Sequence, residues 1–276
     1  MPPRSDSAQR GPHPALKGLV ESYTGTSLTG CTPGIHLGTP SLTLPLIMSL
    51  RDHPVVQLQS RTGADRVAYQ GLVAGLQLAP VLIDHASSAM TLTVELTPRG
   101  LTELFGARPS DWFGVSVHAA DALGRSVEEL RQRVEFLDGW PARFAAVDAY
   151  LLALRRDRRS APTLADRAWR TIRATGGGLT VEQLAGQLGT SRRTLQSCLV
   201  SQLGVGPKAL SRVARFGRAR ELVHARLQHR APEPTLAAIA ARVGYADEAH
   251  LIRDWRLFTG CTPIRWRDVD AFAFSD

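Results

Sequence analysis

Residues 235–267 read TLAAIAARVGYADEAHLIRDWRLFTGCTPIRWR and contain the signals that decide the fold of the C-terminal region. Apolar residues recur at helical spacing from Leu236 to Val243, which gives a first helix one apolar face. Gly244 is expected to end that helix, because glycine adopts the left-handed backbone conformation without a Cβ clash. Asp247 is a favourable N-cap for a second helix. The buried stripe of this second helix is expected to be Leu251, Trp255 and Phe258. The stretch therefore predicts a helix-turn-helix unit.

The same pattern occurs a second time, about 55 residues earlier in the chain. The matched residues are Leu184 with Ile239, Ala185 with Ala240, Leu188 with Val243 and Gly189 with Gly244. Two helix-turn-helix units in tandem are therefore predicted, and their second helices fall near residues 191–203 and 247–258. A long helix that begins at Pro207 joins the units and is expected to hold them at a fixed spacing.

Positive charge is concentrated in the same part of the chain. The 276 residues have a formal net charge of +8, and residues 155–276 hold 21 Lys+Arg against 11 Asp+Glu. A positive domain attracts phosphate, and a polar-faced helix after a tight turn fits a DNA major groove. Two such units on one helix can enter successive major grooves, about 34 Å apart. These features indicate sequence-specific binding of double-stranded DNA.

Polar side chains on the outer faces of the two second helices are the candidates for base recognition. Arginine can bond to two acceptors of guanine, glutamine can pair with adenine, and glutamate can accept from cytosine. The candidates are Arg192, Arg193, Thr194, Gln196, Glu248, His250 and Arg253. Alternatively, these are ordinary solvated side chains, or some of the arginines contact only phosphate.

Four further residues are candidates for contact with the DNA backbone. They are Thr180, Arg212, Arg215 and Thr235. Thr180 and Thr235 are first of all expected to cap helices, and such a helix start can also direct backbone N–H groups at phosphate. For Arg212 and Arg215, the alternative is a solvated face of the linking helix.

The N-terminal half has a different sequence pattern. Residues 15–94 contain short apolar stretches with alternating polarity, separated by glycine and proline, which predicts a small antiparallel sandwich or barrel. Residues 1–14 are predicted to be a mobile tail and do not resemble a signal peptide.

Helices are expected from Pro98 onwards. One of them, from Pro141 to Leu154, is amphipathic and either packs in the core or forms a dimer seam. A charged run after Leu154 marks the domain boundary, which gives domains of residues 15–158 and 159–276.

The second unit resembles the AraC/XylS family of bacterial transcription regulators. The residues that carry the resemblance are Ile239-Ala240, Val243-Gly244-Tyr245, Asp247, Leu251, Arg253, Trp255, Gly260, Thr262-Pro263 and Trp266-Arg267. The resemblance implies an α+β fold, in which a β-rich, cupin-like N-terminal domain with helices precedes an all-α domain of two helix-turn-helix units. In this family the N-terminal domain commonly binds an effector, mediates dimerisation, or does both. The implied partners are double-stranded DNA, a small-molecule effector, RNA polymerase and a second copy of the chain as a homodimer.

Signatures of other function classes are missing from the sequence. The longest apolar runs are too short to span a membrane, so no membrane partner is expected. The three cysteines have no CxxC spacing, which fits a reducing, cytoplasmic location. The eight histidines form no HxH pair, and no GxSxG or P-loop pattern occurs, so no metal, cofactor or enzymatic activity is expected. Two alternatives stay open: a constitutive dimeric regulator without a ligand, and an enzyme whose N-terminal domain carries the chemistry.

Overall fold

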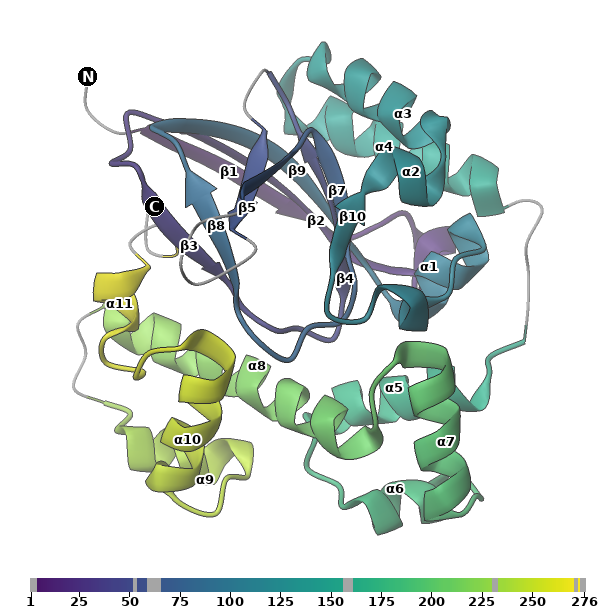
Figure 1. Ribbon diagram of the computed structural model, residues 1–276, viewed down its shortest axis with the longest axis vertical. Helices are drawn as coiled ribbons and strands as arrows, with labels where there is room; N and C mark the ends of the chain where they lie inside the picture. The colour runs from purple at the N-terminus through teal and green to yellow at the C-terminus, as the bar shows by residue number, and fades with distance from the viewer. Residues whose placement is uncertain are drawn as a thin grey trace.

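The computed structural model describes residues 4–51, 54–58, 66–155, 161–229, 233–270 and 273. The fold is α+β, with antiparallel sheets in the N-terminal part and helices in the C-terminal part, as expected (Figure 1). Within the described ranges, the larger sheet has the strand order β1 (Arg4–Arg10), β2 (Val20–Thr29), β9 (Ser88–Leu96), β4 (Leu44–Ser49), β7 (Gly71–Ala74) and β10 (Ser116–His118). The smaller sheet has the order β3 (Gly34–Gly38), β8 (Val81–His85), β5 (Val55–Leu58) and β6 (Arg66–Tyr69).

Side chains alternate along β9, so they show how the environments of the two faces of the larger sheet differ. Met90, Leu92, Val94 and Leu96 are buried in the main apolar core. Thr93 and Glu95 lie on the other face, since successive side chains of a strand point to opposite sides. These two residues line a cavity together with residues of the smaller sheet. The apolar core therefore lies between the larger sheet and helices, whereas the space between the two sheets is partly polar.

Residues 4–10 were expected to belong to a mobile tail, and this expectation is wrong. They form β1, which pairs with β2 from Arg4 opposite Thr29 to Arg10 opposite Tyr23. Beyond the backbone ladder, the carboxylate of Asp148 accepts hydrogen bonds from the Arg10 guanidinium and from the backbone N–H of His13. The segment is an edge strand that is held mainly by backbone hydrogen bonds to β2. It therefore needs no apolar face, and its polar sequence gave no sign of a strand.

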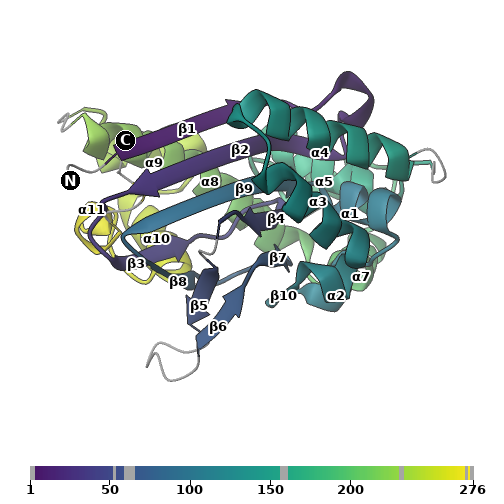
Figure 2. The same cartoon turned by 90° about the horizontal axis from the view of Figure 1, so that it is seen from above.

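Helices of the N-terminal part lie against the larger sheet, as the view from above shows (Figure 2). They are α1 (Pro98–Phe105), α2 (Ala119–Leu123), α3 (Arg125–Glu135) and α4 (Gly139–Arg155), with short 3-10 turns η1 (Pro14–Leu16) and η2 (Pro109–Trp112). On α4, Phe144, Val147 and Leu151 are buried in the main core. Core packing is therefore confirmed for these residues, and they are not free to form a dimer seam. The domain boundary expected near residue 158 lies outside the described residues.

The C-terminal part is built around one long helix. Its elements are α5 (Leu164–Thr175), α6 (Val181–Gln187), α7 (Arg192–Leu203), α8 (Pro207–Gln228), α9 (Leu236–Val243), α10 (Glu248–Thr259) and α11 (Trp266–Val269). The pair α6–α7 and the pair α9–α10 lie near opposite ends of α8, both on the side away from the sheets (Figure 1). No helix in the described part of the chain has the length and apolarity needed to cross a bilayer.

The N-terminal part packs against both ends of the C-terminal part. One continuous apolar core includes Leu96 and Phe144 of the N-terminal part and Trp169 and Leu195 of the C-terminal part. The indole N–H of Trp169 also donates to the Leu42 carbonyl oxygen at 2.8 Å. At the other end of α8, the buried carboxylate of Asp270 accepts from the backbone N–H of Leu37 on β3 at 3.0 Å.

Candidate nucleic-acid interface

The helix starts that define the two units are capped as the sequence predicted. Thr180, Ser191, Thr235 and Asp247 each accept a hydrogen bond from the backbone N–H three residues later. The Thr180 cap is a full capping box, because the Gln183 side chain also accepts from the Thr180 N–H at 2.9 Å. The turns use glycine in the left-handed region, with φ of 65° at Gly189 and 85° at Gly244.

An aromatic cluster fixes the second unit to α8. Phe216 of α8 lies edge-on to Trp255, with ring centroids 5.3 Å apart, and tilted against Phe258 at 5.0 Å. Trp255 also packs edge-on against Trp266 at 5.4 Å. Leu251, Trp255 and Phe258 are buried, as the apolar stripe of residues 247–258 predicted. This packing holds α10 in one orientation and leaves its polar face outward.

Most of the candidate base-reading residues lie on exposed faces. On α7, the side chains of Arg192, Arg193, Thr194 and Gln196 are exposed; on α10, Glu248 and Arg253 are exposed. His250 is half-buried, and its ring lies edge-on to Tyr245 with centroids 5.0 Å apart. Thr194 is within 2.9 Å of the Ser191 hydroxyl, which ties it to the helix cap. The two faces therefore retain exposed arginine, glutamine and glutamate side chains that can reach base edges.

Two of the candidate phosphate contacts, Arg212 and Arg215, already have partners within the chain. Arg212 pairs with the Asp254 carboxylate, with its Nη2 2.6 Å from Oδ1 and its Nε 3.3 Å from Oδ2. Arg215 donates from Nη2 to the Gly177 carbonyl oxygen at 2.9 Å and lies over the Tyr245 ring. Asp254 was not among the residues that the sequence analysis singled out, because a pairing between two helices leaves no local sequence pattern. Its pairing makes Arg212 a connection between α8 and α10.

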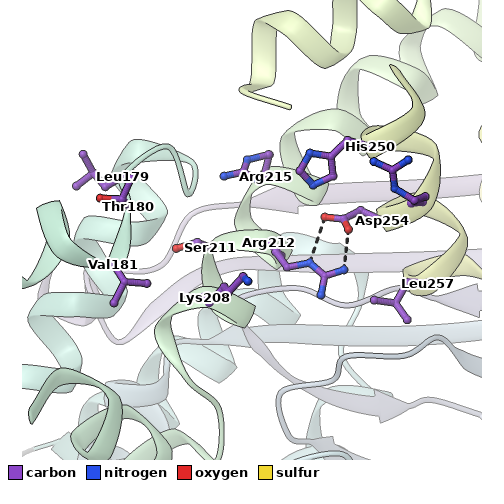
Figure 3. A pocket seen from close by; sticks show the side chains of 11 residues that line it. Leu179, Thr180, Val181, Lys208, Ser211, Arg212, Arg215, His250, Asp254 and Leu257 are labelled. Carbon is purple, nitrogen blue, oxygen red and sulfur yellow. Dashed lines mark hydrogen bonds and ion pairs between the residues drawn. The ribbon is translucent and has the colours of Figure 1, made fainter. Parts of the chain in front are cut away.

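A cleft of about 750 Å³ opens between the two units (Figure 3). Leu179, Thr180 and Val181 line it from the first unit, and His250, Arg253, Asp254 and Leu257 line it from α10. Lys208, Ser211, Arg212 and Arg215 of α8 lie between these two sides. Lys208 is a candidate that the sequence analysis missed. Its position four residues before Arg212 places both on one face of α8, a helical spacing that could have revealed it.

A second cavity of about 460 Å³ lies between the sheets and is bordered by two side chains of the C-terminal helices. Polar side chains from the strands line it, including Ser22, Thr24, Thr43, Gln57, Thr93 and Glu95. Arg173 of α5 and Arg220 of α8 line the same cavity. Burial raises the pKa of Glu95, while the hydrogen bond from the Thr43 hydroxyl, 2.5 Å, and the positive charge of Arg220 act in the opposite direction. Burial likewise lowers the pKa of Arg220.

Within the part of the chain that is described, histidine, cysteine, aspartate and glutamate form no group of three that can hold a metal ion. The three described cysteines, Cys31, Cys198 and Cys261, are free thiols of intermediate exposure.

Comparison with known proteins agrees with this architecture. A family model described as a helix-turn-helix domain matches residues 184–268. No curated protein sequence matches the chain. An apo variant of ToxT from Vibrio cholerae strain SCE256 has a similar structure, with a TM-score of 0.53 and 9% identity over 94% of this chain and 99% of that chain. ToxT from Vibrio cholerae O395 bound to (E)-4-(8-methylnaphthalen-1-yl)but-3-enoic acid gives a TM-score of 0.51, with 10% identity over 99% of each chain.

These structural likenesses concern the fold, since the identities are low. The matched helix-turn-helix domain indicates that the chain binds DNA. The tandem units and the β-rich N-terminal part are those that the family resemblance implied. Residues 184–268 therefore belong to a helix-turn-helix domain, and the fold of the whole chain is similar to that of ToxT.

Proposed function

We propose that the chain regulates transcription by reading two successive major grooves of one DNA site, with α7 in one groove and α10 in the next. The observation that carries this proposal is the length of the helix that joins the units. At about 1.5 Å per residue, the 22 residues of α8 span about 33 Å. Successive major grooves on one face of DNA are separated by about 34 Å. A single continuous helix of this length is suited to hold two reading units in register with DNA.

Selection of bound sites from random DNA tests this function. We expect recovered sites to contain two short conserved blocks, centred about 10 base pairs apart. Affinity for these sites should fall steeply with salt, because arginine–phosphate contacts release counterions. Recovery of a single conserved block would mean that only one of the two units recognises bases. Failure to enrich any sequence would contradict the proposed function.

The cavity between the sheets is the proposed effector site. Its volume lies within the range of small-molecule pockets. Arg220 belongs to α8 and also donates to the Thr39 hydroxyl of the N-terminal part, so a ligand in the cavity would meet the helix that joins the reading units. Arg173 of α5 contributes a second cation and pairs with Glu21. Binding would therefore act on both ends of the DNA-binding part through direct contacts.

The lining favours a small ligand with several hydrogen-bonding groups. The solved ToxT complex contains an apolar carboxylic acid. In this chain the cavity instead contains the buried Glu95 carboxyl and several hydroxyl and amide side chains. An apolar ligand would displace water from these groups without replacing its hydrogen bonds, whereas a polar ligand can replace them. Sugars, polyols and amino acids are the classes that fit this lining.

A thermal-shift panel of sugars, polyols, amino acids and long-chain fatty acids tests the ligand class. We expect a polar compound to raise the melting temperature of the wild type, and Glu95→Gln or Arg220→Gln to reduce the shift. Arg218→Gln is the matched control, because Arg218 is exposed on the same helix and does not line the cavity. Stabilisation by fatty acids alone would contradict the proposed polar class. Homodimerisation and contact with RNA polymerase stay predictions.

A further inference from the structure

We propose that the cleft between the two helix-turn-helix units binds DNA phosphate. The phosphates would belong to the strand segment that lies between the two major grooves occupied by α7 and α10. The inference rests on the proposed DNA-reading function and adds a site to it. Base recognition belongs to the exposed faces of α7 and α10. The cleft would instead hold the sugar–phosphate backbone that lies between them, without regard to sequence.

The charges that line the cleft favour an anion. Four cationic side chains, Lys208, Arg212, Arg215 and Arg253, line it together with a single carboxylate, that of Asp254. Arg212 neutralises this carboxylate through its two short contacts. Lys208, Arg215 and Arg253 then have no carboxylate partner among the residues that the structure describes. Arg253 is assigned to a base, so Lys208 and Arg215 are the two cations left for phosphate, and the three charges together create a positive potential that attracts it.

The position of these residues fits a strand that runs between the units. Lys208 is exposed in the first turn of α8 and lies nearer the first unit, whereas Arg253 is exposed on α10 of the second unit. Figure 3 shows Thr180 and Val181 on one side of the hollow, His250 and Asp254 on the other, and Arg215 between them. A backbone segment in this hollow would be flanked by both reading helices.

Arg215 provides an independent indication that the site lacks an acceptor. Its Nη2 donates to Gly177, and its guanidinium lies over the ring of Tyr245. Its Nε is buried and has no hydrogen-bond partner in the described part of the chain. The Tyr245 hydroxyl is also buried without a partner there. A guanidinium that is only partly satisfied within the chain can donate its remaining N–H groups to a phosphate oxygen, which is an acceptor of the right charge.

The lysine content of the chain allows a direct test. Lys17 and Lys208 are the two lysines of the sequence. Both are exposed, but Lys17 lies just beyond η1 in the N-terminal part, away from the cleft. The wild-type chain is acetylated with and without a duplex recovered by site selection, and modification of each lysine is measured by mass spectrometry. We expect the duplex to protect Lys208 severalfold and to leave Lys17 unchanged.

Two charge-removing variants complete the test, and their fold is checked by circular dichroism and melting temperature. Lys208→Gln should lower affinity for specific and non-specific duplexes by the same factor. It should also reduce the slope of log affinity against log salt by about 0.9, the value for one phosphate contact. Lys17→Gln should change neither. Replacing the phosphates between the two conserved blocks by methylphosphonates should weaken the wild type severalfold and Lys208→Gln much less.

The outcomes separate this site from the function on which it rests. Sequence-specific binding with Lys208 fully reactive, or with an unchanged salt slope in Lys208→Gln, would overturn the phosphate site and leave the DNA-reading function intact. Absence of binding to every duplex would overturn both. Protection of Lys208 together with a loss confined to one base pair would show a base contact in place of a phosphate contact, which would also overturn the site as proposed.

Discussion

The Arg212 guanidinium on α8 contacts the Asp254 carboxylate on α10 at two points, with Nη2–Oδ1 of 2.6 Å and Nε–Oδ2 of 3.3 Å. Asp254 is only 3% exposed, and Arg212 supplies its charged hydrogen bonds. The contact adds a charged connection to the aromatic packing of Phe216 against Trp255 and Phe258. It fixes α10 of the second helix-turn-helix unit to α8, the helix that follows the first unit.

We expect Arg212→Ala to lower the free energy of unfolding by about 1–3 kcal/mol, because it removes charged hydrogen bonds from a buried carboxylate. Asp254→Asn should cost less, since the amide remains able to hydrogen-bond. Urea denaturation of both single variants and of the double variant measures their coupling energy. Arg256→Ala, an exposed residue of α10, is the control and should change stability by less than about 0.5 kcal/mol. Additive effects of the two changes would argue against a connection between the helices.

Arg253 is expected to read one base pair. Arg253→Ala should reduce affinity by about 1–3 kcal/mol for the preferred site and relax the preference at a single position. Binding titrations on duplexes that vary one base pair at a time measure this loss. Arg256→Ala again serves as the matched control on the same helix. An equal loss on every duplex would instead place the Arg253 guanidinium on phosphate.

Gly204 tests the contact between the first unit and the N-terminal part. Its φ is +76°, and an added Cβ would lie 2.5 Å from the Cβ of Phe113. Gly189 has a similar φ of +65°, but an added Cβ there meets nothing within 4 Å. Gly189→Ala should therefore cost about 1–2 kcal/mol from backbone strain alone. Gly204→Ala should cost about 1–3 kcal/mol more, because the contact is overpacked.

Thermal unfolding of the two alanine variants measures this difference. Introducing Phe113→Ala should reduce the added cost of Gly204→Ala and leave the cost of Gly189→Ala unchanged. Equal costs at the two glycines would show that the N-terminal part does not press on the first unit in solution.

The raised pKa of Glu95 predicts a pH-dependent loss of stability. The folded state keeps this carboxyl protonated above its ordinary pKa of 4.5, so the folded chain binds more protons than the unfolded chain there. The free energy of unfolding should then fall as the pH rises from about 4.5 through the raised pKa. Urea denaturation across this range should show a smaller decline for Glu95→Gln than for the wild type. Glu248→Gln, at an exposed position, should follow the wild type; identical profiles for all three would contradict the prediction.

The C-terminal part could be predicted well from the sequence, because its signals are local. The N-caps at Thr180 and Asp247, the left-handed glycine at 244 and the buried stripe at Leu251 each depend on residues within a few positions of one another. Helix spacing also indicated which side chains of α7 and α10 are exposed. What local patterns could not show was pairing across helices, so the bond between Arg212 and Asp254 was not anticipated.

The N-terminal part was harder to predict, since its strands pair over long separations in the sequence. β1 has the polar sequence of a tail, and only pairing with β2 makes it a strand. The cavity between the sheets combines Glu95 of β9 with Arg220 of α8, which are 125 residues apart in the sequence. The alternation of β9 predicted a strand correctly, but it did not indicate that the polar face would enclose a cavity.

Methylation interference on a selected DNA site tests the central claim most directly, because methylation of guanine N7 blocks the major groove without altering the backbone charge. If α7 and α10 occupy successive grooves, two short tracts of interference should appear on one face of the duplex, about 10 base pairs apart. Arg193→Ala should weaken only the tract assigned to α7, and Arg253→Ala only the tract assigned to α10. A single tract that responds to both substitutions would contradict the two-groove account.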